Sequence, residues 1–552
     1  MNTTFLSGEL FANMIRCGAQ SLYEKRETVN GLNVFPIPDG DTGDNMYMTI
    51  DSGCLAIQEN ETSLDGVSSS VANGMLMGAR GNSGVILSRF FAGVAKALSN
   101  TKTASVAEFA DALLFGVSEA YSAVSNPTEG TILTVFRESS QYARERIIPE
   151  YTFEDFFSDY LSEIEASLKR TPSLLSVLEE AGVVDSGGAG FMYIARGMRD
   201  ALDGKTAEAT DRGVGARAVD LSLFSEDSVL LYGYCTELLI RLQRSKVDLD
   251  AFDESVISDY LNSVGDSVVF FREGSVIKLH VHTENPGDVL NFCRRYGEFL
   301  TVKIENMTLQ HSETEENKAQ KEESSILTTG KKKPYGIVVV AAGEGIKENL
   351  REVGADVIVD GGQSMNPSTK DFIDAYGKCG AEVIFVFPSN RNVILAAEQS
   401  ASVYKESKVI VVPTKTVGES YAALPMLDFS LDDPEEIKKG ALEATAGVVS
   451  GFISRSVRDA HINCVDIAMG EYIGVADKEI LVGSPEREKA LLSLTEKLSA
   501  GDYDIMLIFC GMDVPEDEAE KVYREISEKY RRTEVIMIDG GQPIYDYMIT
   551  LE

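Results

Sequence analysis

The stretch from Asn33 to Met46 reads NVFPIPDGDTGDNM and carries the densest chemical signal in the chain. Its two prolines exclude a helix across the first half, and its glycines permit tight turns. Asp39 and Asp41 lie two positions apart on this constrained loop, with Asp44 and Asn45 just beyond. Carboxylates this close together repel each other unless a cation lies between them. The loop therefore predicts a site for a divalent cation, with an acidic surface turn as an equal alternative.

The spacing of these acidic residues narrows the choice of metal. Counted from Asp39, the glycine position of a calcium-binding EF-hand loop falls on Asp44, and its bidentate glutamate position falls on Ile50. That motif is therefore excluded. A short, incomplete set of oxygen ligands is typical of Mg²⁺, which retains water and takes further ligands from substrate phosphates. We therefore predict magnesium rather than calcium.

A second loop, GARGNSG at residues 78–84, precedes an apolar stretch with helical spacing from Val85. Its three glycines, which include Gly81, expose backbone N–H groups, and Asn82 or Ser83 is expected to cap the helix. The positive end of the helix dipole favours an anion there. The P-loop pattern GxxxxGK[ST] is missing, so this loop alone is a weak signal, because many such turns only cap helices.

Two further loops have the same character. Residues 129–131 (EGT) precede an apolar helical stretch, and residues 185–188 (DSGG) precede a helix expected from Phe191. One glycine-rich helix start is ordinary. Three of them, together with an Asp-Gly-Asp loop, predict a pocket for phosphate and metal at the rim of a helical bundle.

The overall composition limits the class of protein. With 552 residues, the chain is too long for one ordinary domain. Acidic residues number 87 against 51 basic residues, and the resulting formal charge of −36 disfavours binding to nucleic acid or to an anionic membrane surface. The seven cysteines are widely spaced and form no CxxC pair, which is typical of a reducing compartment. Without a secretory signal or a membrane-spanning apolar stretch, the protein is expected in the cytoplasm.

The pattern of residues changes along the chain and predicts a multidomain protein. The expected parts are an all-α helical domain at residues 1–204, a linker at 205–227, a small α+β domain at 228–310, a charged linker at 311–333 and an α/β domain at 334–552. In the last of these, apolar β-rich runs alternate with helical stretches, which indicates βαβ crossovers and a parallel sheet. A second block of the same pattern near the C-terminus predicts two lobes.

The middle domain contains the motif KLHVHTENPG, in which His280 and His282 lie two positions apart in a strand-like run. A period of two places both imidazoles on one face of the strand. Cys235 lies on another expected strand, so two histidines and one cysteine are available as zinc ligands, with water or Glu237 as the fourth. From spacing alone, two partly buried histidines and a core cysteine remain the alternative.

Four motifs occur along the chain in the order NVFPIPDGDTGDNM, MGARGNSGVILS, EGTILT and VVDSGGAG. In order and spacing they resemble the nucleotide-binding domain shared with the L-subunit of dihydroxyacetone kinases. With the two domains that follow, nearly the whole chain resembles the ATP-binding subunit of bacterial fatty acid kinases. The resemblance implies an N-terminal barrel of eight helices that holds ADP and two Mg²⁺ ions.

The roles of family residues carry over to positions in this sequence. Asp39 and Asp41 correspond to Mg²⁺ ligands and are the expected catalytic carboxylates. Arg80 is a candidate for stabilising transferred charge, although a surface position explains it equally well. Nucleotide-binding roles are expected for Thr42, Asn45, Gly81, Asn82, Ser83, Thr131, Asp185 and Gly187. The remaining metal ligand stays open between Asn33, where the related kinases have an aspartate, and Asp44, where they have a small hydroxyl residue.

The same resemblance gives expectations for the other two domains. It implies a zinc ion bound by Cys235, His280 and His282, and a DegV-like C-terminal domain that docks a separate DegV-like protein carrying a fatty acid. The expected reaction transfers the γ-phosphoryl group of ATP to the fatty acid carboxylate and gives an acyl phosphate. A homodimer is also expected. The alternatives are a dihydroxyacetone-type (glycerone) kinase and a non-enzymatic lipid-binding or scaffold protein.

Overall fold

The computed structural model divides the chain into two compact units. One unit combines Met1–Thr210 with Lys332–Glu552, and the other is Asp211–Lys331. The predicted linkers at 205–227 and 311–333 lie almost wholly outside the described residues. The described residues are 3–32, 40–58, 61–124, 126–206, 234–243, 246–247, 252, 255–273, 276–283, 285–306, 332–361, 366–462, 465–477 and 479–552.

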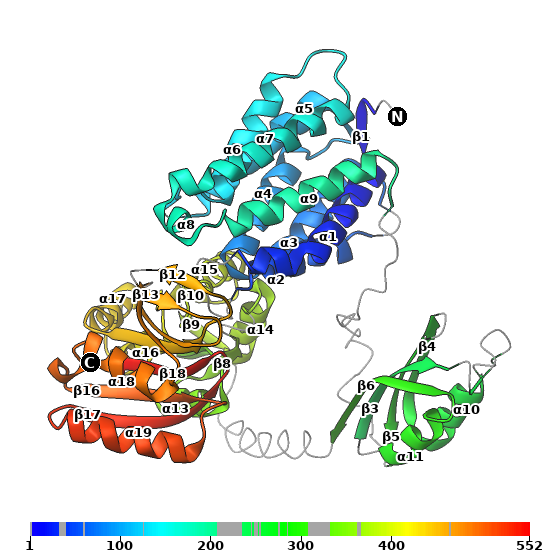
Figure 1. The fold of residues 1–552 in the computed structure, drawn as a ribbon. Helices are drawn as coiled ribbons and strands as arrows, with labels where there is room; N and C mark the ends of the chain where they lie inside the picture. Colours follow the sequence, from blue (N-terminus) through cyan, green and yellow to red (C-terminus); the bar gives the residue numbers. More distant parts are fainter. Residues whose placement is uncertain are drawn as a thin grey trace. The chain divides into compact units, whose positions relative to one another are not determined.

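The N-terminal region is helical, as the sequence predicts (Figure 1). Its described residues form α1 (Gly8–Asn30), α2 (Thr42–Leu55), α3 (Leu64–Gly78), α4 (Gly81–Ala97), α5 (Val106–Ser122), α6 (Ile132–Glu145), α7 (Phe153–Leu174), α8 (Ser176–Ala181) and α9 (Ser186–Leu202). Two short strands, β1 (Phe5–Ser7) and β2 (Thr103–Ser105), pair antiparallel, a detail that helical periodicity does not reveal. That the helices close into a barrel of eight stays a prediction.

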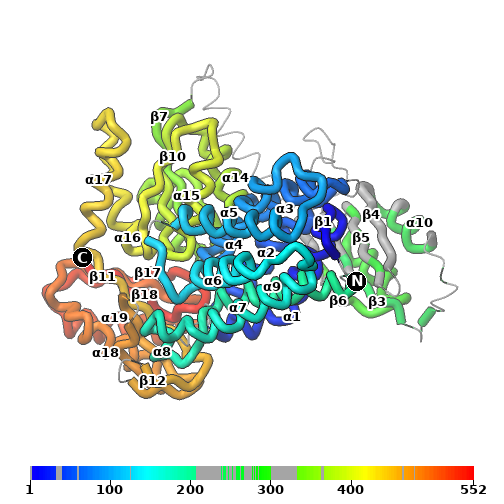
Figure 2. The backbone as a smooth tube through the Cα atoms, turned by 90° about the horizontal axis from the view of Figure 1, so that it is seen from above, coloured from blue at the N-terminus to red at the C-terminus, as the bar shows by residue number. Residues whose placement is uncertain are grey.

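Aromatic side chains fill the interior of this helical region. Phe90, Phe136 and Phe191 are each at most 2% exposed. The ring of Phe136 lies 4.3 Å from that of Phe90 and 4.5 Å from that of Phe191, and burial of such rings is a large source of stability. Helices α1 and α9 lie side by side in both views (Figures 1 and 2). This close approach requires Gly197, where a Cβ would lie 2.2 Å from the backbone oxygen of Cys17.

The second unit has the predicted α+β content. Its described elements are β3 (Tyr234–Leu242), α10 (Ser255–Val264), β4 (Asp266–Glu273), β5 (Val276–Thr283), α11 (Pro286–Cys293) and β6 (Gly297–Asn306). The strands form an antiparallel sheet in the order β4-β5-β3-β6. Alternate residues of β3 and β5 are buried, among them Leu238, Ile240, Leu279 and Val281. One face of the sheet therefore forms the core of this unit.

The first lobe of the C-terminal region is a parallel α/β sheet, as predicted. Its strands are β7 (Lys333–Ala341), β8 (Val357–Asp360), β9 (Ala381–Phe387) and β10 (Lys408–Val411), in the order β10-β9-β7-β8. Its helices are α13 (Glu344–Glu352), α14 (Thr369–Cys379), α15 (Ile394–Val403), α16 (Val417–Ala423) and α17 (Pro434–Thr445). Neighbouring strands in this order pair in parallel, which matches the continuous apolar runs of the sequence.

The second lobe departs from the repeated parallel pattern. Its strands are β11 (Val449–Arg455), β14 (Tyr472–Ala476), β15 (Glu479–Ser484), β16 (Ile505–Gly511), β17 (Glu534–Gln542) and β18 (Tyr545–Leu551), with helices α18 (Arg487–Lys497) and α19 (Glu516–Lys529). Strands β16 and β17 pair in parallel, whereas the other described pairs of this sheet are antiparallel. A separate hairpin joins β12 (Ala460–Ile462) to β13 (Val465–Ile467).

Within the first unit, the residue Ala79 before α4 and the residue Val85 near the start of α4 pack into the core of the α/β region. Ala79 and Val85 are at most 2% exposed and belong to one apolar cluster with Val338, Phe372 and Ala396. Among the described residues, no helix combines the length and apolar content that crossing a bilayer requires.

Candidate nucleotide and metal site

The candidate site lies where the N-terminal ends of α2, α4, α6 and α9 meet. The hydroxyl of Ser186, at the start of α9, donates a hydrogen bond of 3.2 Å to the hydroxyl of Thr42, at the start of α2. A Cβ on Gly187 would lie 3.2 Å from the Cβ of Ile132 in α6 and 3.5 Å from Oγ of Ser83 in α4. Each helix start presents unsatisfied N–H groups and the positive end of its dipole. Four such ends together suit a bound polyanion.

Helix α4 begins earlier than the sequence indicates. It starts at Gly81 rather than Val85, and its N-cap is Arg80. The prediction that Asn82 or Ser83 caps this helix is therefore wrong, because both residues lie within its first turn.

The early start follows from close packing against α2. Gly81 has a φ of +58°, and a Cβ there would lie 2.6 Å from Nδ2 of Asn45. A Cβ on Gly84 would lie 2.4 Å from Oγ1 of Thr49. That hydroxyl also accepts a hydrogen bond of 3.3 Å from the backbone N–H of Arg80. The glycines thus bring the 78–84 loop and the predicted residue Asn45 together.

Asp185 joins the starts of α9 and α6. It is the N-cap of α9, and its carboxylate accepts a hydrogen bond of 2.7 Å from the backbone N–H of Gly188. It also accepts a backbone hydrogen bond from Ile132. Burial is the largest influence on this group and raises the pKa of Asp185 to about 6, against the lowering effect of the two hydrogen bonds. The site therefore contains a carboxyl group whose charge is poorly solvated.

The loop that carries Thr131 is fixed by Glu129. The carboxylate of Glu129 accepts hydrogen bonds from Oγ1 of Thr134 at 2.6 Å and from Nη2 of Arg137 at 2.8 Å. Thr131 itself is the N-cap of α6, and its hydroxyl donates to the backbone oxygen of Thr128 at 2.8 Å. The predicted EGT loop thus lies at a helix start, as expected, and α6 supplies its anchors.

Asp44 lies in the first turn of α2 and contacts α1. Its Oδ2 accepts a hydrogen bond of 2.7 Å from Nδ2 of Asn30, and its Oδ1 lies 3.5 Å from Nε of Arg26. The Oδ1 of Asn30 in turn accepts from the backbone N–H of Gly43 at 2.7 Å. These contacts hold the start of α2 against α1. Two of the other predicted metal ligands of this loop, Asn33 and Asp39, lie outside the described residues.

Two predicted residues, Asp41 and Arg80, contact the α/β region. Oδ2 of Asp41 accepts a hydrogen bond of 2.6 Å from Nδ2 of Asn366. Nη1 of Arg80 donates a hydrogen bond of 2.7 Å to the backbone oxygen of Asn366 and lies 3.4 Å from Oδ2 of Asp371. Asn366 was not among the predicted site residues, because ordinary turn chemistry explains the motif Asn-Pro-Ser at a strand–helix corner equally well.

The oxygen atoms of the site suit a hard cation. They include the carboxylate of Asp41 and, at the adjoining helix starts, the hydroxyls of Thr42 and Ser186. The side chain of the predicted residue Asn82 instead donates to Oδ1 of Asn392 at 3.3 Å. Among the described residues, no group of three or more His, Cys, Asp or Glu side chains is clustered to hold a metal. Mg²⁺ needs only one or two protein carboxylates when water and phosphates complete its shell. The residues present therefore fit a magnesium ion bound together with a nucleotide.

The side chains of the predicted zinc ligands lie outside what the structure describes, whereas their strands β3 and β5 pair in a defined register. Cys235 in β3 pairs with His282 in β5, and Glu237 pairs with His280. Because side chains alternate along a strand, these four positions share the face opposite the buried residues such as Leu238.

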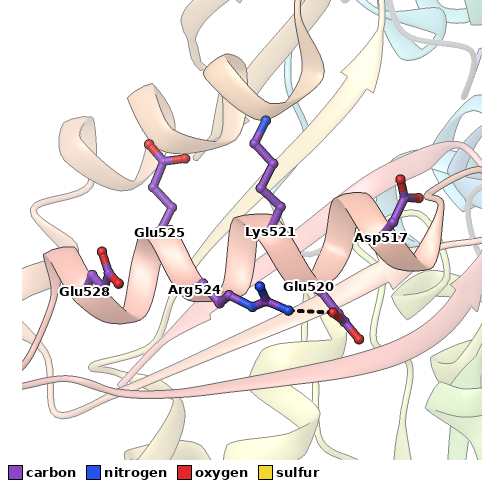
Figure 3. A pocket seen from close by; sticks show the side chains of 6 residues that line it. All are labelled: Asp517, Glu520, Lys521, Arg524, Glu525 and Glu528. Atoms are coloured by element: carbon purple, nitrogen blue, oxygen red, sulfur yellow. Dashed lines mark hydrogen bonds and ion pairs between the residues drawn. The ribbon is translucent and has the colours of Figure 1, made fainter.

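A separate hollow lies along the exposed face of α19 and is lined by Asp517, Glu520, Lys521, Arg524, Glu525 and Glu528 (Figure 3). Arg524 pairs with Glu520 at 2.8 Å, and both side chains are more than 60% exposed. All six residues belong to one helix, so the hollow is an open charged surface and shares no residue with the candidate site.

Comparisons with known proteins cover all three regions of the chain. The family model of the DAK2 domain matches residues 36–200, and the middle and C-terminal models of FakA-like fatty acid kinases match residues 231–314 and 336–552. A DegV protein of Bacillus subtilis, described as a fatty acid binding protein, has a similar structure with a TM-score of 0.30 and 13% identity, over 40% of this chain and 98% of that one. The dihydroxyacetone kinase from C. freundii, solved with AMP-PNP and Mg²⁺, gives a TM-score of 0.27 and 16% identity, over 34% and 33%. At these TM-scores, neither likeness supports a conclusion by itself.

The strongest evidence on family comes from a full-length relative. Protein YloV of Bacillus subtilis (strain 168) is 40% identical over 565 residues, which cover 100% of both chains. The three family models follow one another along the chain in the order that the resemblance implies. The chain therefore belongs to the FakA-like family of fatty acid kinases.

Proposed function

We propose that this protein is the catalytic subunit of a fatty acid kinase, an ATP-dependent phosphotransferase. Its substrate is the carboxylate of a fatty acid carried by a separate DegV-like protein, and its products are ADP and an acyl phosphate. The observation that carries this proposal is that the N-terminal ends of α2, α4, α6 and α9 lie together beside Asp41. Ser186 and Thr42 are hydrogen-bonded, and a Cβ on Gly187 would lie within 3.5 Å of Ile132 and Ser83. Such a site is built to bind phosphates and a cation.

We assign the roles of the residues as follows. Asp39 and Asp41 bind Mg²⁺. Asp44 contacts α1, and we therefore assign it to holding the start of α2 in place. Mg²⁺, when bound, neutralises phosphate charge and orients the γ-phosphoryl group. The nucleotide phosphates are held by the helix starts, through Thr42, Asn45, Gly81, Asn82, Ser83, Thr131, Asp185 and Gly187. We assign Arg80 to stabilising the charge of the transferred phosphoryl group. Its Nη1 also donates a hydrogen bond to the backbone oxygen of Asn366.

The chemistry requires no general base. A fatty acid carboxylate is already ionised near neutral pH, and one of its oxygens forms the new bond to the γ-phosphorus. The bond between that phosphorus and the β,γ-bridging oxygen breaks, and ADP leaves with the electron pair. Positioning and charge neutralisation then account for catalysis. This agrees with a site made of carboxylates, hydroxyls, glycines and helix ends.

The other regions receive supporting roles in this proposal. We assign residues 1–204 to nucleotide and Mg²⁺, residues 228–310 to a zinc ion, and residues 334–552 to docking of the acyl carrier. The strand register that pairs Cys235 with His282 and brings His280 to the same face supports the zinc assignment. A homodimer and a cytoplasmic location belong to the same proposal.

The test measures ADP release by the full chain with fatty-acid-loaded DegV-like carrier, and traps the acyl phosphate with hydroxylamine. We expect turnover only when carrier, ATP and Mg²⁺ are all present. Asp41→Ala should lower kcat by roughly 100-fold or more, as expected when a group that organises transition-state charge is lost. Asp517→Ala, on the exposed face of α19, serves as a matched acidic control.

The alternative functions predict different outcomes of the same assay. Phosphorylation of dihydroxyacetone without any carrier would support a glycerone kinase. Failure to consume ATP under every condition would support a lipid-binding or scaffold protein. Either result contradicts the proposal.

A further inference from the structure

Asn366 lies in the corner between β8 and α14 and reaches the candidate metal site of the helical region. Its Nδ2 donates the 2.6 Å hydrogen bond to Oδ2 of Asp41. A carboxylate can only accept a hydrogen bond, so the amide nitrogen must be the atom that faces Asp41. The residue is 1% exposed. Water therefore competes poorly for this contact, and the bond is strengthened by the charge of the acceptor.

Asn366 is itself held in place by the glycine-rich 78–84 loop. Nη1 of Arg80 donates to the backbone oxygen of Asn366 at 2.7 Å. The backbone N–H of Thr369 donates to the backbone oxygen of Ala79 at 3.2 Å. Asp371, which forms a capping box with Ser368 at the start of α14, lies 3.4 Å from Nη1 of Arg80. The amide is therefore fixed by contacts on both sides before it reaches Asp41.

The contact with Asn366 orients Asp41 from outside its own helix. Asp41 is the N-cap of α2, yet its side chain makes no capping hydrogen bond to that helix. A metal-binding carboxylate commonly gives one oxygen to the cation while the other accepts a hydrogen bond that fixes its direction. Among the described residues, the Oδ1 atom of Asn366 has no hydrogen-bond partner, so the contact of Nδ2 with Asp41 orients this amide. Nδ2 of Asn366 lies 3.2 Å from where a Cβ on Gly81 would be, so the amide adjoins the expected nucleotide loop.

We propose that Asn366 is a positioning residue for Asp41, so that the α/β region completes the metal and nucleotide site of the helical region. The inference rests on the proposed function, because it takes Asp41 to be a Mg²⁺ ligand. It assigns the α/β region a part in nucleotide binding, beyond docking of the acyl carrier.

The test compares Asn366→Ala with Gln399→Ala in the full chain. Gln399 is also buried and also bridges the two regions. Its Nε2 donates to the backbone oxygen of Leu76 at 3.0 Å and to the hydroxyl of Thr369 at 3.1 Å, and neither bond involves Asp41 or Asn366. Calorimetric titration of Mg²⁺ in the presence of AMP-PNP reports metal affinity directly. We expect Asn366→Ala to weaken Mg²⁺ binding about 10–100-fold, the usual effect of removing a group that orients a metal ligand. Gln399→Ala should bind Mg²⁺ within about two-fold of the unaltered chain, as a site without contact to the ligand predicts.

A second measurement uses the unaltered protein and does not depend on the variants folding. Addition of Mg²⁺ with AMP-PNP should slow amide hydrogen exchange in residues 366–372, because the occupied site holds Asp41 and therefore Asn366.

The outcomes separate this inference from the proposed function. If the unaltered chain binds no Mg²⁺ with AMP-PNP, the proposed function fails and the inference with it. Two results would overturn the inference alone, provided that the unaltered chain binds Mg²⁺ with AMP-PNP. One is that Asn366→Ala binds Mg²⁺ as tightly as the unaltered chain, and the other is that Gln399→Ala weakens Mg²⁺ binding as much as Asn366→Ala does. Unchanged exchange at 366–372 on binding would also overturn it.

Discussion

The carboxylate of Asp185 accepts a 2.7 Å hydrogen bond from the backbone N–H of Gly188, and thereby caps the helix whose first turn borders the candidate site. Burial nevertheless raises the pKa of Asp185 to about 6. A raised pKa means that ionisation is opposed in the folded protein. The protonated Asp185 carboxyl therefore contributes fully to the free energy of unfolding below about pH 4. This contribution is lost as the pH rises through about 6.

Asp185→Asn should consequently stabilise the protein at pH 7.5 by on the order of 1–3 kcal/mol, and have little effect near pH 4. Urea denaturation at the two pH values checks this. Asp203→Asn at the other end of α9 is the control with the opposite sign, because a hydrogen bond from Arg199 lowers the pKa of Asp203. That variant should be slightly destabilised at pH 7.5. Equal stabilisation of Asp185→Asn at both pH values would show that its charge is not the cause.

Gly81→Ala should damage both folding and nucleotide binding. The residue has a φ of +58°, and the added Cβ would lie 2.6 Å from Nδ2 of Asn45. Gly182 has a similar φ of +66°, but nothing lies within 4 Å of the Cβ position, so Gly182→Ala reports backbone strain alone. We expect a loss of about 1–2 kcal/mol for Gly182→Ala and a larger loss for Gly81→Ala. Equal losses in denaturation experiments would mean that the contact with Asn45 is unimportant.

Arg487→Met should strongly destabilise the second lobe of the α/β region. Arg487 makes two hydrogen bonds to Glu518, at 2.8 and 2.6 Å, and one of 2.6 Å to Asp546, with all three side chains at most 18% exposed. Its removal leaves two poorly solvated carboxylates, for which a loss of about 3–5 kcal/mol is expected. Arg524→Met, which removes the exposed pair with Glu520, should lose no more than about 1 kcal/mol. Similar losses in the two variants would contradict this account.

The approximate helix starts around the candidate site could be predicted from the sequence because their signals are local. Glycine-rich loops before apolar periodic stretches mark the starts of α4, α6 and α9, and four ordered motifs identify the family. The exact helix starts could not be predicted in the same way. Helix α4 begins at Gly81 and α9 at Ser186, because turn residues with small side chains join the helix where they pack against a neighbour.

Contacts between distant parts of the chain could not be predicted. Asn366 and Asp41 are separated by 325 positions, and the sequence around either residue does not indicate that the two are in contact. The mixed sheet of the second lobe was missed for a related reason. An alternation of strands and helices indicates β16, α19 and β17, which pair in parallel as expected. The place of β18, antiparallel between β11 and β16, is set by packing rather than by its own sequence.

We propose above all that residues at the start of α2 bind a cation that also contacts the phosphates of a nucleotide. Calorimetric titration of AMP-PNP into the full chain, with Mg²⁺ and with EDTA, tests it most directly. We expect binding that requires Mg²⁺ and that weakens at least about 100-fold in Asp41→Ala, while Asp517→Ala binds as the unaltered chain does. Binding of the same strength in EDTA, or in Asp41→Ala, would contradict the claim.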